Sequence, residues 1–218
     1  MSKQKQPDLS RVRRIPKRGH YDKETLHRIL DSSLVCHVGF NEGDQPVVIP
    51  TLVARTGDQL LLHGSSKSRM MQHAAAGHPI CVTVTHIDGL VLARSAFHHS
   101  VNYRSAVFFG TCEEVTEYDA KMEALAAFTD KLIPGRWDDS RQPTPNEMKA
   151  TAVVALNVSE ASAKIRNGPP VDDDEDYALP IWAGIMPITQ HIGEPIPDEL
   201  LRDGILVPDY LQAMVSKV

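Results

Sequence analysis

The sequence has few cysteines and no long apolar run, and each of these features argues against a class of protein. Its three cysteines, Cys36, Cys81 and Cys112, have neither zinc nor redox spacing, which argues against a disulfide framework and predicts a reducing compartment. No apolar run reaches membrane-spanning length, and the polar start lacks the apolar centre of a signal peptide. We therefore expect a soluble, cytoplasmic protein with no membrane partner.

The chain also has fewer basic than acidic residues. The 218 residues carry 23 Lys and Arg against 28 Asp and Glu, and a formal net charge of −5 argues against a nucleic-acid partner. The local exception is a basic N-terminal arm, residues 1–19, which we expect in solvent. The histidines show no zinc spacing, so we expect no metal site. With 42% hydrophobic residues, the chain suits one domain with a sizeable core.

The middle of the chain has the pattern of short strands separated by turns. Turn residues such as those at 41–44 and 87–89 favour hairpins, and hairpins favour an antiparallel sheet. Six or more such strands commonly close into a barrel, which removes their edges. We predict a mainly β fold, an antiparallel split β-barrel with peripheral helices. The expected strands are 34–40, 46–54, 59–63, 80–86, 90–93, 101–115 and 152–165, with helices at 66–76 and 119–132.

Composition divides the chain into four parts. After the basic arm, residues 20–167 hold the strands and form the predicted barrel. Residues 168–180 contain a run of acidic side chains from Asp172 to Asp176, and we expect a solvated linker there. Residues 181–218 form a C-terminal extension with two short Pro-initiated helices, near 197–202 and 208–215. We expect this extension to pack on the barrel or on a partner subunit.

The most informative stretch is the end of strand 59–63 together with the turn after it. The strand ends at His63 and the chain turns at Gly64. A helix is expected to begin within the next five residues. A helix N-terminus offers free N–H groups and a positive dipole end, so a phosphate could bind there. An ordinary helix start would also use serine as its cap. The candidate phosphate-binding residues are Ser65, Ser66, Lys67, Ser68 and Arg69, of which Lys67 and Arg69 add charge.

A second polar group precedes the apolar run 106–110. On a strand, Asn102 and Arg104 point to one face, while Tyr103 and Ser105 point to the other. One face could therefore offer amide and guanidinium donors to the polar edge of a ring. A solvated strand end would carry the same residues.

Taken together, four motifs resemble the pyridoxamine 5′-phosphate oxidase-related flavoproteins, and within them most closely the branch of the nitroimidazole-resistance reductases. The resemblance extends over about residues 14–190, and the joint order of the motifs is more specific than any one of them. It implies a split β-barrel, usually a homodimer, that holds FMN between its subunits. The motifs are Pro50-Thr51, His63 to Arg69, His99 to Ser105 with Gly110, and Trp182 to Pro187.

The resemblance also implies a role for each motif. The serine-rich turn would hold the flavin phosphate, and strands 46–54 and 59–63 would approach the isoalloxazine with backbone groups. Strand 101–115 would bring donors near the flavin from the same or the other subunit, and Trp182 would cover one end of the ring or tether the tail. The implied cofactor-binding residues are Pro50, Thr51, Leu62, His63, Ser65, Ser66, Lys67, Ser68, Arg69, Asn102, Arg104, Ser105 and Trp182.

These expectations lead to an FMN-binding oxidoreductase that takes hydride from NAD(P)H and passes electrons to a small acceptor. Its catalytic residues are unknown, and His63 and Tyr103 are the candidates if a proton must move. The tail at 191–218 lacks the paired Arg and His that the oxidase uses to bind its substrate. Oxidation of pyridoxamine phosphate is therefore not expected.

Three alternatives stay open. Split barrels also hold haem, with an axial histidine such as His98, His99 or His191, although haem offers no phosphate to the serine-rich turn. A deazaflavin could replace FMN. A non-catalytic flavin store or regulator is also compatible with the sequence, because a fold does not fix a function.

Overall fold

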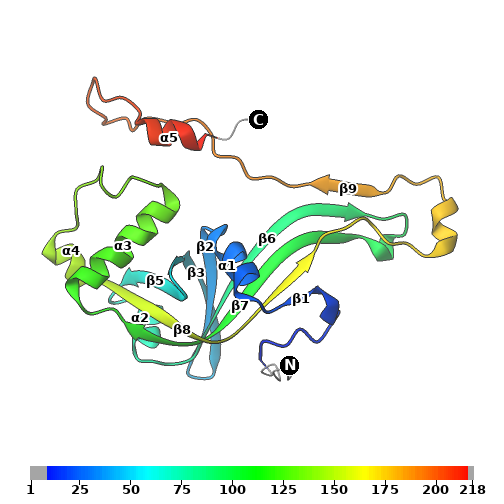
Figure 1. The fold of residues 1–218 in the computed structure, drawn as a ribbon, viewed down its shortest axis with the longest axis horizontal. Helices are drawn as coiled ribbons and strands as arrows, with labels where there is room; N and C mark the ends of the chain where they lie inside the picture. Colours follow the sequence, from blue (N-terminus) through cyan, green and yellow to red (C-terminus); the bar gives the residue numbers. More distant parts are fainter. Residues whose placement is uncertain (1–8, 216–218) are drawn as a thin grey trace.

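A computed structural model describes residues 9–215, and nine strands in this part of the chain form one antiparallel sheet (Figure 1). The strands are β1 Gly19–His20, β2 Val35–Glu42, β3 Gln45–Leu52, β4 Ala54–Thr56, β5 Gln59–Ser65, β6 Ile80–Leu92, β7 Ser100–Glu114, β8 Thr151–Arg166 and β9 Gly184–Pro187. The helices are α1 Lys23–Asp31, α2 Arg69–Ala75, α3 Tyr118–Leu132, α4 Pro145–Ala150 and α5 Asp209–Met214, with short 3-10 turns at Pro16–Arg18, Ala96–His98 and Asp174–Ala178.

The two ends of the sheet meet at a single buried residue of the chain. Its order is β3-β2-β6-β7-β8-β5-β4, with β1 on β8 and β9 on β6. Val53, which is 1% exposed, links β3 directly to β4, and β4 pairs with β5. The two ends of the strand order are therefore consecutive in the chain, which confirms the predicted mainly β barrel.

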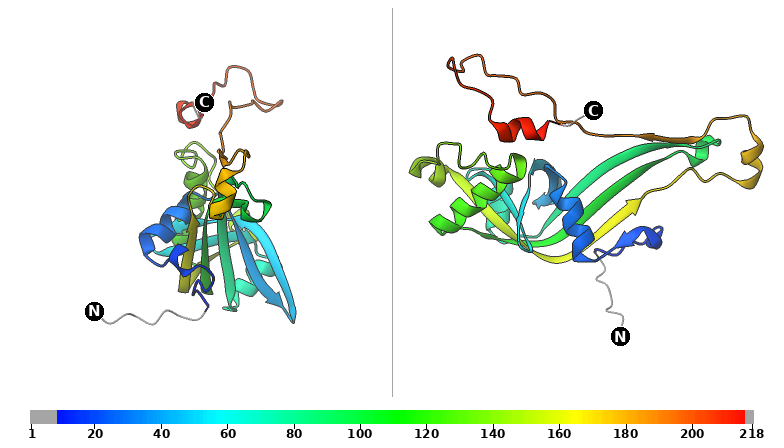
Figure 2. Two further views of the ribbon diagram at one scale, coloured as in Figure 1. Left: turned by 90° about the vertical axis from the view of Figure 1, so that its right-hand side faces the viewer. Right: turned by 45° about the horizontal axis from the view of Figure 1, so that its top comes forward.

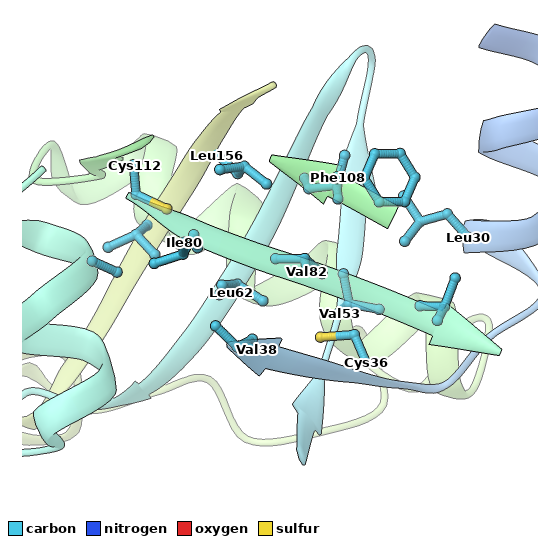
Figure 3. Packing of buried hydrophobic residues seen from close by; sticks show 14 of the residues in the cluster. Leu30, Cys36, Val38, Val53, Leu62, Ile80, Val82, Phe108, Cys112 and Leu156 are labelled. Carbon is cyan, nitrogen blue, oxygen red and sulfur yellow. The ribbon is translucent and has the colours of Figure 1, made fainter. Parts of the chain in front are cut away.

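The alternation of side chains along β5 separates two apolar clusters. Leu60 and Leu62 point into the barrel, where Val38, Val82 and Phe108 also lie (Figure 3). Leu61 points to the other face, where α3 covers the sheet. The barrel end near α1 is closed by Ile29 and Leu30, and the Asp22 carboxylate caps this helix by accepting from Thr25 N at 2.8 Å.

The three cysteines lie in or beside the barrel core as free thiols. Cys36 and Cys112 are buried, and burial raises the pKa of each thiol to about 12. They pack as small apolar side chains.

Several predicted boundaries are wrong. The sequence predicts two strands around a turn over residues 80–93, but β6 is one strand with a register shift between Ile87 and Gly89. The helix expected over 66–76 begins only at Arg69. The helix expected over 119–132 begins one residue earlier, at Tyr118, with Glu117 at its N-cap position. In the tail, α5 forms within 208–215, whereas 197–202 contains only a turn.

The basic arm lies against the sheet where the structure describes it. Ser10 N donates to Glu160 Oε2 at 3.1 Å, and Val12 N donates to the Tyr21 hydroxyl at 2.9 Å. The expectation of an arm in solvent therefore holds only in part, because Ser10 and Val12 are tied to Glu160 and Tyr21 while Arg11, Arg13, Arg14 and Lys17 are exposed. Residues 1–8 of the predicted arm lie outside the described residues.

The acidic segment is held to the rest of the chain at Asp172, whereas Asp173, Asp174 and Glu175 are exposed, as expected for a solvated segment. The Asp172 side chain is fully buried, and its Oδ1 accepts from the backbone N–H of Arg94 at 2.9 Å and of Ser95 at 3.1 Å. Its Oδ2 lies 3.1 Å from Arg94 Nη1. Desolvation pushes the pKa of Asp172 upward, but the hydrogen bonds from Ser95 and Arg94 outweigh it and hold the pKa below its usual value.

After β9 the tail runs back along the barrel to α5 (Figures 1 and 2). Tyr210 of α5 donates to Asp139 at 2.6 Å and accepts from Arg136 Nη1 at 3.0 Å, so the tail contacts the loop that follows α3. Within residues 9–215, no helix is both long and apolar enough to cross a membrane.

Candidate functional site

The serine-rich turn, residues 65–69, links β5 to α2 and is shaped by bonds within its own chain. Ser66 N donates to the last carbonyl of α4 at 2.9 Å, and Ser68 N donates to Ser65 O at 2.9 Å. Lys67 N donates to the Ser65 hydroxyl at 3.2 Å. The expectation that the backbone N–H groups here are free is therefore wrong for these three. The turn offers an anion its hydroxyl groups and the exposed Lys67 ammonium.

Arg69 is directed toward a carboxylate on the neighbouring hairpin. Its Nη1 lies 2.5 Å from Glu42 Oε2, and both side chains are more than half exposed. The pair stands at the rim of an open groove of 530 Å³ between β2 and α2. A phosphate at the turn would have to replace Glu42 as the partner of Arg69. Exposed ion pairs are weak, so this exchange costs little.

His63 points away from the barrel core and lies beneath α3. It follows Leu62 on β5, so the alternation that buries Leu62 inside the barrel turns His63 to the outer face. Its ring packs against Phe128 with centroids 4.2 Å apart and planes at 53°. Its Nδ1 is buried and has no hydrogen-bond partner among the described residues. Burial lowers the pKa of His63, which favours the neutral imidazole.

His63 lines a cavity of 420 Å³ between β5 and the helical segment 118–150. This volume is within the roughly 300–1,000 Å³ that small-molecule sites occupy. The walls are mostly apolar and the rim is charged, because Arg141 donates to both carboxylate oxygens of Glu147 at 2.9 and 2.8 Å. Arg141 and the Thr144 cap lower the pKa of Glu147 to about 2. The lining residues besides His63 are Leu52, Leu125, Phe128, Thr129, Leu132, Trp137, Ser140, Arg141, Pro143, Glu147, Met148 and Thr151.

The polar residues predicted on β7 all have partners in their own chain. The Asn102 side chain is bound on both sides, since Oδ1 accepts from Gly168 N at 3.2 Å and Nδ2 donates to Gly168 O at 3.2 Å. Arg104 makes a two-pronged ion pair with Asp88, with Nε–Oδ2 at 2.9 Å and Nη2–Oδ1 at 2.8 Å. The Ser105 hydroxyl donates to a backbone carbonyl of β8 at 3.3 Å. Asn102 therefore anchors the chain as it leaves the barrel.

Trp182 and Tyr103 lie at the same end of the molecule as this group. Trp182 is 66% exposed, and its ring packs so closely over Gly184 that a Cβ there would lie 2.9 Å from it. Tyr103 is half-buried on β7, opposite Ile87 of β6. Trp182 thus precedes the strand that pairs with the far end of β6.

The predicted site residues fall into two groups within one chain. β3 carries Pro50 and Thr51, and β5 leads through Leu62 and His63 into the serine-rich turn. β7 begins at the opposite end of the molecule, where Asn102, the next predicted residues on β7 and Trp182 lie (Figure 1). One chain does not bring the two groups together.

The sequence analysis missed the residues that α3 and its following loop contribute to the cavity. The apolar spacing of Leu125, Phe128 and Leu132 is visible in the sequence and predicts a buried helix face. It does not say which surface that face covers. Trp137 and Arg141 lie in a polar, Pro-rich loop without periodicity, so nothing local indicates that they line a cavity with His63.

The sequence profile of the pyridoxamine 5′-phosphate oxidase family matches residues 22–165, about two thirds of the chain and all of the barrel from α1 to β8. The chain belongs to this family. Its match to the pyridoxamine 5′-phosphate oxidase profile confirms the resemblance drawn from the four motifs. A search of curated proteins found no match.

Two solved structures of this family's fold resemble the chain over nearly its whole length. The flavocytochrome Anf3 from Azotobacter vinelandii is 40% identical, with a TM-score of 0.90 over 95% of this chain and 97% of that one. An FAD- and haem-binding protein from Mycobacterium smegmatis is 38% identical, with a TM-score of 0.87 over 91% and 97%. A putative 5-nitroimidazole resistance protein from Bacteroides thetaiotaomicron shares the fold, at 20% identity and a TM-score of 0.54 over 67% and 87%.

Proposed function

We propose that this chain is a redox protein that binds both a flavin and a haem. The observation that carries this proposal is the extent of the two strong similarities. At 95% and 91% of the chain, they include most of the segment after residue 165, which the family profile does not reach. Both relatives are named for a flavin and haem or for a flavocytochrome, whereas the nitroimidazole-resistance likeness covers 67% of the chain.

The flavin would lie along the serine-rich turn. The turn's hydroxyl groups, Lys67 and a redirected Arg69 would bind its phosphate, and the backbone near Pro50, Thr51 and Leu62 would face the ring system. FMN satisfies these contacts, and FAD carries the same phosphate with a nucleotide added. The bound flavin supplies hydride and single-electron chemistry, and the chain's residues bind and orient it.

The haem would lie in the cavity beneath α3. The cavity fits a haem in three respects: its walls are mostly apolar and include aromatic rings, its rim carries a guanidinium, and the His63 imidazole lines it. Arg141 could exchange Glu147 for a haem carboxylate, since the same two-pronged geometry serves both. The sequence analysis treated haem as an alternative to FMN. We propose both cofactors together, because the serine-rich turn and this cavity are separate surfaces and one chain could bind a cofactor at each.

We propose that the functional unit is a homodimer, with NAD(P)H as electron donor and a small molecule as acceptor. In a dimer, the predicted site residues of β7 (Asn102, Arg104 and Ser105) and Trp182 of one chain could approach the serine-rich turn of the other. Within one chain they lie far from that turn. The free thiols agree with a cytoplasmic setting. In a protein that held the flavin alone, His63 and Tyr103 would be the candidates for proton transfer.

The test is an absorbance spectrum of the purified full-length protein, with its cofactors extracted and identified, before and after NADH is added. Flavin bands together with a Soret band, both reduced by NADH, would support the proposal. Flavin bands without a Soret band, even after haem is supplied, would reject the haem and leave a flavin reductase. A protein that takes up neither would reject the function altogether.

A further inference from the structure

His63 is chemically unlike the other histidines of this chain. Its Nδ1 is the histidine nitrogen that is both sealed from solvent and without a hydrogen-bond partner within residues 9–215. Because Nδ1 is sealed from the cavity as well as from bulk solvent, a ligand in the cavity can meet only the other ring nitrogen, Nε2, which has no hydrogen-bond partner among the described residues. The surrounding walls are apolar on the sides formed by Leu52 and α3, so the chain itself supplies no group to satisfy it within the described residues.

The packing around His63 fixes the ring instead of leaving it free to move. Phe128 lies against it at a centroid distance of 4.2 Å, and the paired strands β5 and β8 hold its backbone opposite Val153. Burial lowers the pKa of His63, so the imidazole is neutral in the physiological range and keeps a lone pair available. A rigid, neutral imidazole that faces an apolar cavity is what an iron porphyrin requires of its axial ligand.

The three histidines that the sequence suggested for this role are placed differently. His98 lies 3.4 Å from Asp173, His99 Nδ1 lies 3.0 Å from Ser95 O, and His191 Nε2 lies 2.9 Å from the Thr189 hydroxyl. None of these three lines the cavity beneath α3. Each has a partner in its own chain, so none shows the unmet bonding capacity of His63.

We infer that His63 is the axial ligand of the haem, which enters the cavity beneath α3 with its carboxylates toward Arg141. The inference rests on the proposed function, since it assigns a ligand to a cofactor proposed there. It also separates the cofactors in space: His63 serves the haem on the outer face of β5, while the serine-rich turn two residues further along serves the flavin. This reassigns His63 from the flavin-lining residues suggested by the family resemblance.

The experiment compares haem uptake by full-length wild type, by His63→Gly and His63→Gln, and by the control His98→Ala/His99→Ala/His191→Ala. Each purified protein is titrated with haemin, and the Soret band, the EPR spectrum and the bound flavin are recorded. We expect the control to match wild type. In both His63 variants we expect affinity to fall at least about tenfold and the Soret and EPR signatures to change, because loss of even an outer-shell partner costs that much.

The bound flavin, the haem affinity and the spectra of these proteins decide the outcome. Retained flavin shows that a His63 variant is folded, and restoration of the wild-type signature in His63→Gly by added imidazole would support direct ligation. A His63 variant with wild-type affinity and spectrum would overturn the inference while leaving the function standing, as would loss of the signature in the control. Wild type that takes up no haem would instead reject the proposed function. If both His63 variants fail to fold, the EPR spectra of wild type and control decide: a histidine-ligated signature kept in the control supports the inference, and a signature without a histidine ligand overturns it.

Discussion

At the scale of single residues, Lys67 and Arg69 are the two cations of the serine-rich turn that could bind a phosphate. The turn's backbone N–H groups are used within the chain, so a phosphate depends on side chains, above all on these two cations. A charge-assisted hydrogen bond is worth about 1.5–3 kcal/mol. We expect Lys67→Ala/Arg69→Ala to weaken FMN binding by roughly tenfold or more for each cation that contacts the phosphate. Fluorescence titration measures this, and Arg28→Ala/Arg202→Ala removes the same charge from exposed positions as a control. Equal affinity in the two double variants would contradict the phosphate assignment.

Asp172 lies in a buried position, and it predicts a pH dependence. Its pKa is held below the usual value, so its contribution to stability is present above about pH 4 and is lost as the pH falls through the lowered pKa. We expect Asp172→Asn to speed hydrogen exchange at the N–H groups of Arg94 and Ser95 at pH 7. The difference from wild type should shrink below about pH 4. Asp173→Asn, at a side chain that is 75% exposed, is the control and should change little. Equal effects of the two substitutions would mean that the buried bonds do not hold the segment.

At the scale of elements, the pairing of β7 with β8 depends on one glycine at a register shift. A Cβ on Gly110 would lie 2.1 Å from Asn157 O, a backbone atom that cannot move aside cheaply. We expect Gly110→Ala to lower the free energy of unfolding by about 1–3 kcal/mol or more, as overpacking in a closed interior does. Chemical denaturation measures it. Gly168→Ala, which has no atom within 4 Å of the added Cβ, should leave stability nearly unchanged.

The elements also show which parts of the fold the sequence could predict. Strands such as β5 and β8 carry alternating or continuous apolar residues between turn residues, so their existence and antiparallel order could be predicted from the local pattern. The interrupted prediction over 80–93 failed because Gly89 looks like a turn residue. Glycine fits this position because β9 comes close to the backbone there: a Cβ on Gly89 would lie 3.0 Å from Met186 O. The contact between Asp172 and Arg94 was equally hidden, because it joins residues 78 positions apart.

In the candidate site, too, the features formed by neighbouring residues could be predicted, whereas contacts between distant residues could not. The serine-rich turn was visible because its residues are consecutive, and His63 was singled out as a position but given the role that the family resemblance implied. Its actual surroundings come from α3 and a loop more than sixty positions further along. Local spacing carries no information about which helix covers which face of a sheet, so the cavity could not be predicted.

At the scale of the whole molecule, the tail exposes more apolar surface than a solitary chain would be expected to leave in water. Ile196, Leu200 and Leu206 are 92%, 90% and 84% exposed, and they lie on the segment that runs back along the barrel. A second copy would cover such a surface, which supports the proposed homodimer. We expect Ile196→Asp/Leu206→Asp to shift the protein from dimer toward monomer in light scattering coupled to size exclusion. Glu194→Gln/Asp203→Asn, at exposed polar positions of the same segment, should not. A wild type that is monomeric throughout would contradict the proposal.

The pairing of β9 with β6 has a consequence for any shortened form of this protein. β2 pairs with β6 only around residues 81–83, and β9 takes the same side of β6 from Gly89 to Leu92. The tail therefore acts as a cover for backbone N–H and C=O groups that would otherwise stand unpaired at an open strand edge. A chain cut before Gly184 would present that edge to every other copy, and its first failure would be aggregation through β-pairing, before any loss of the barrel itself.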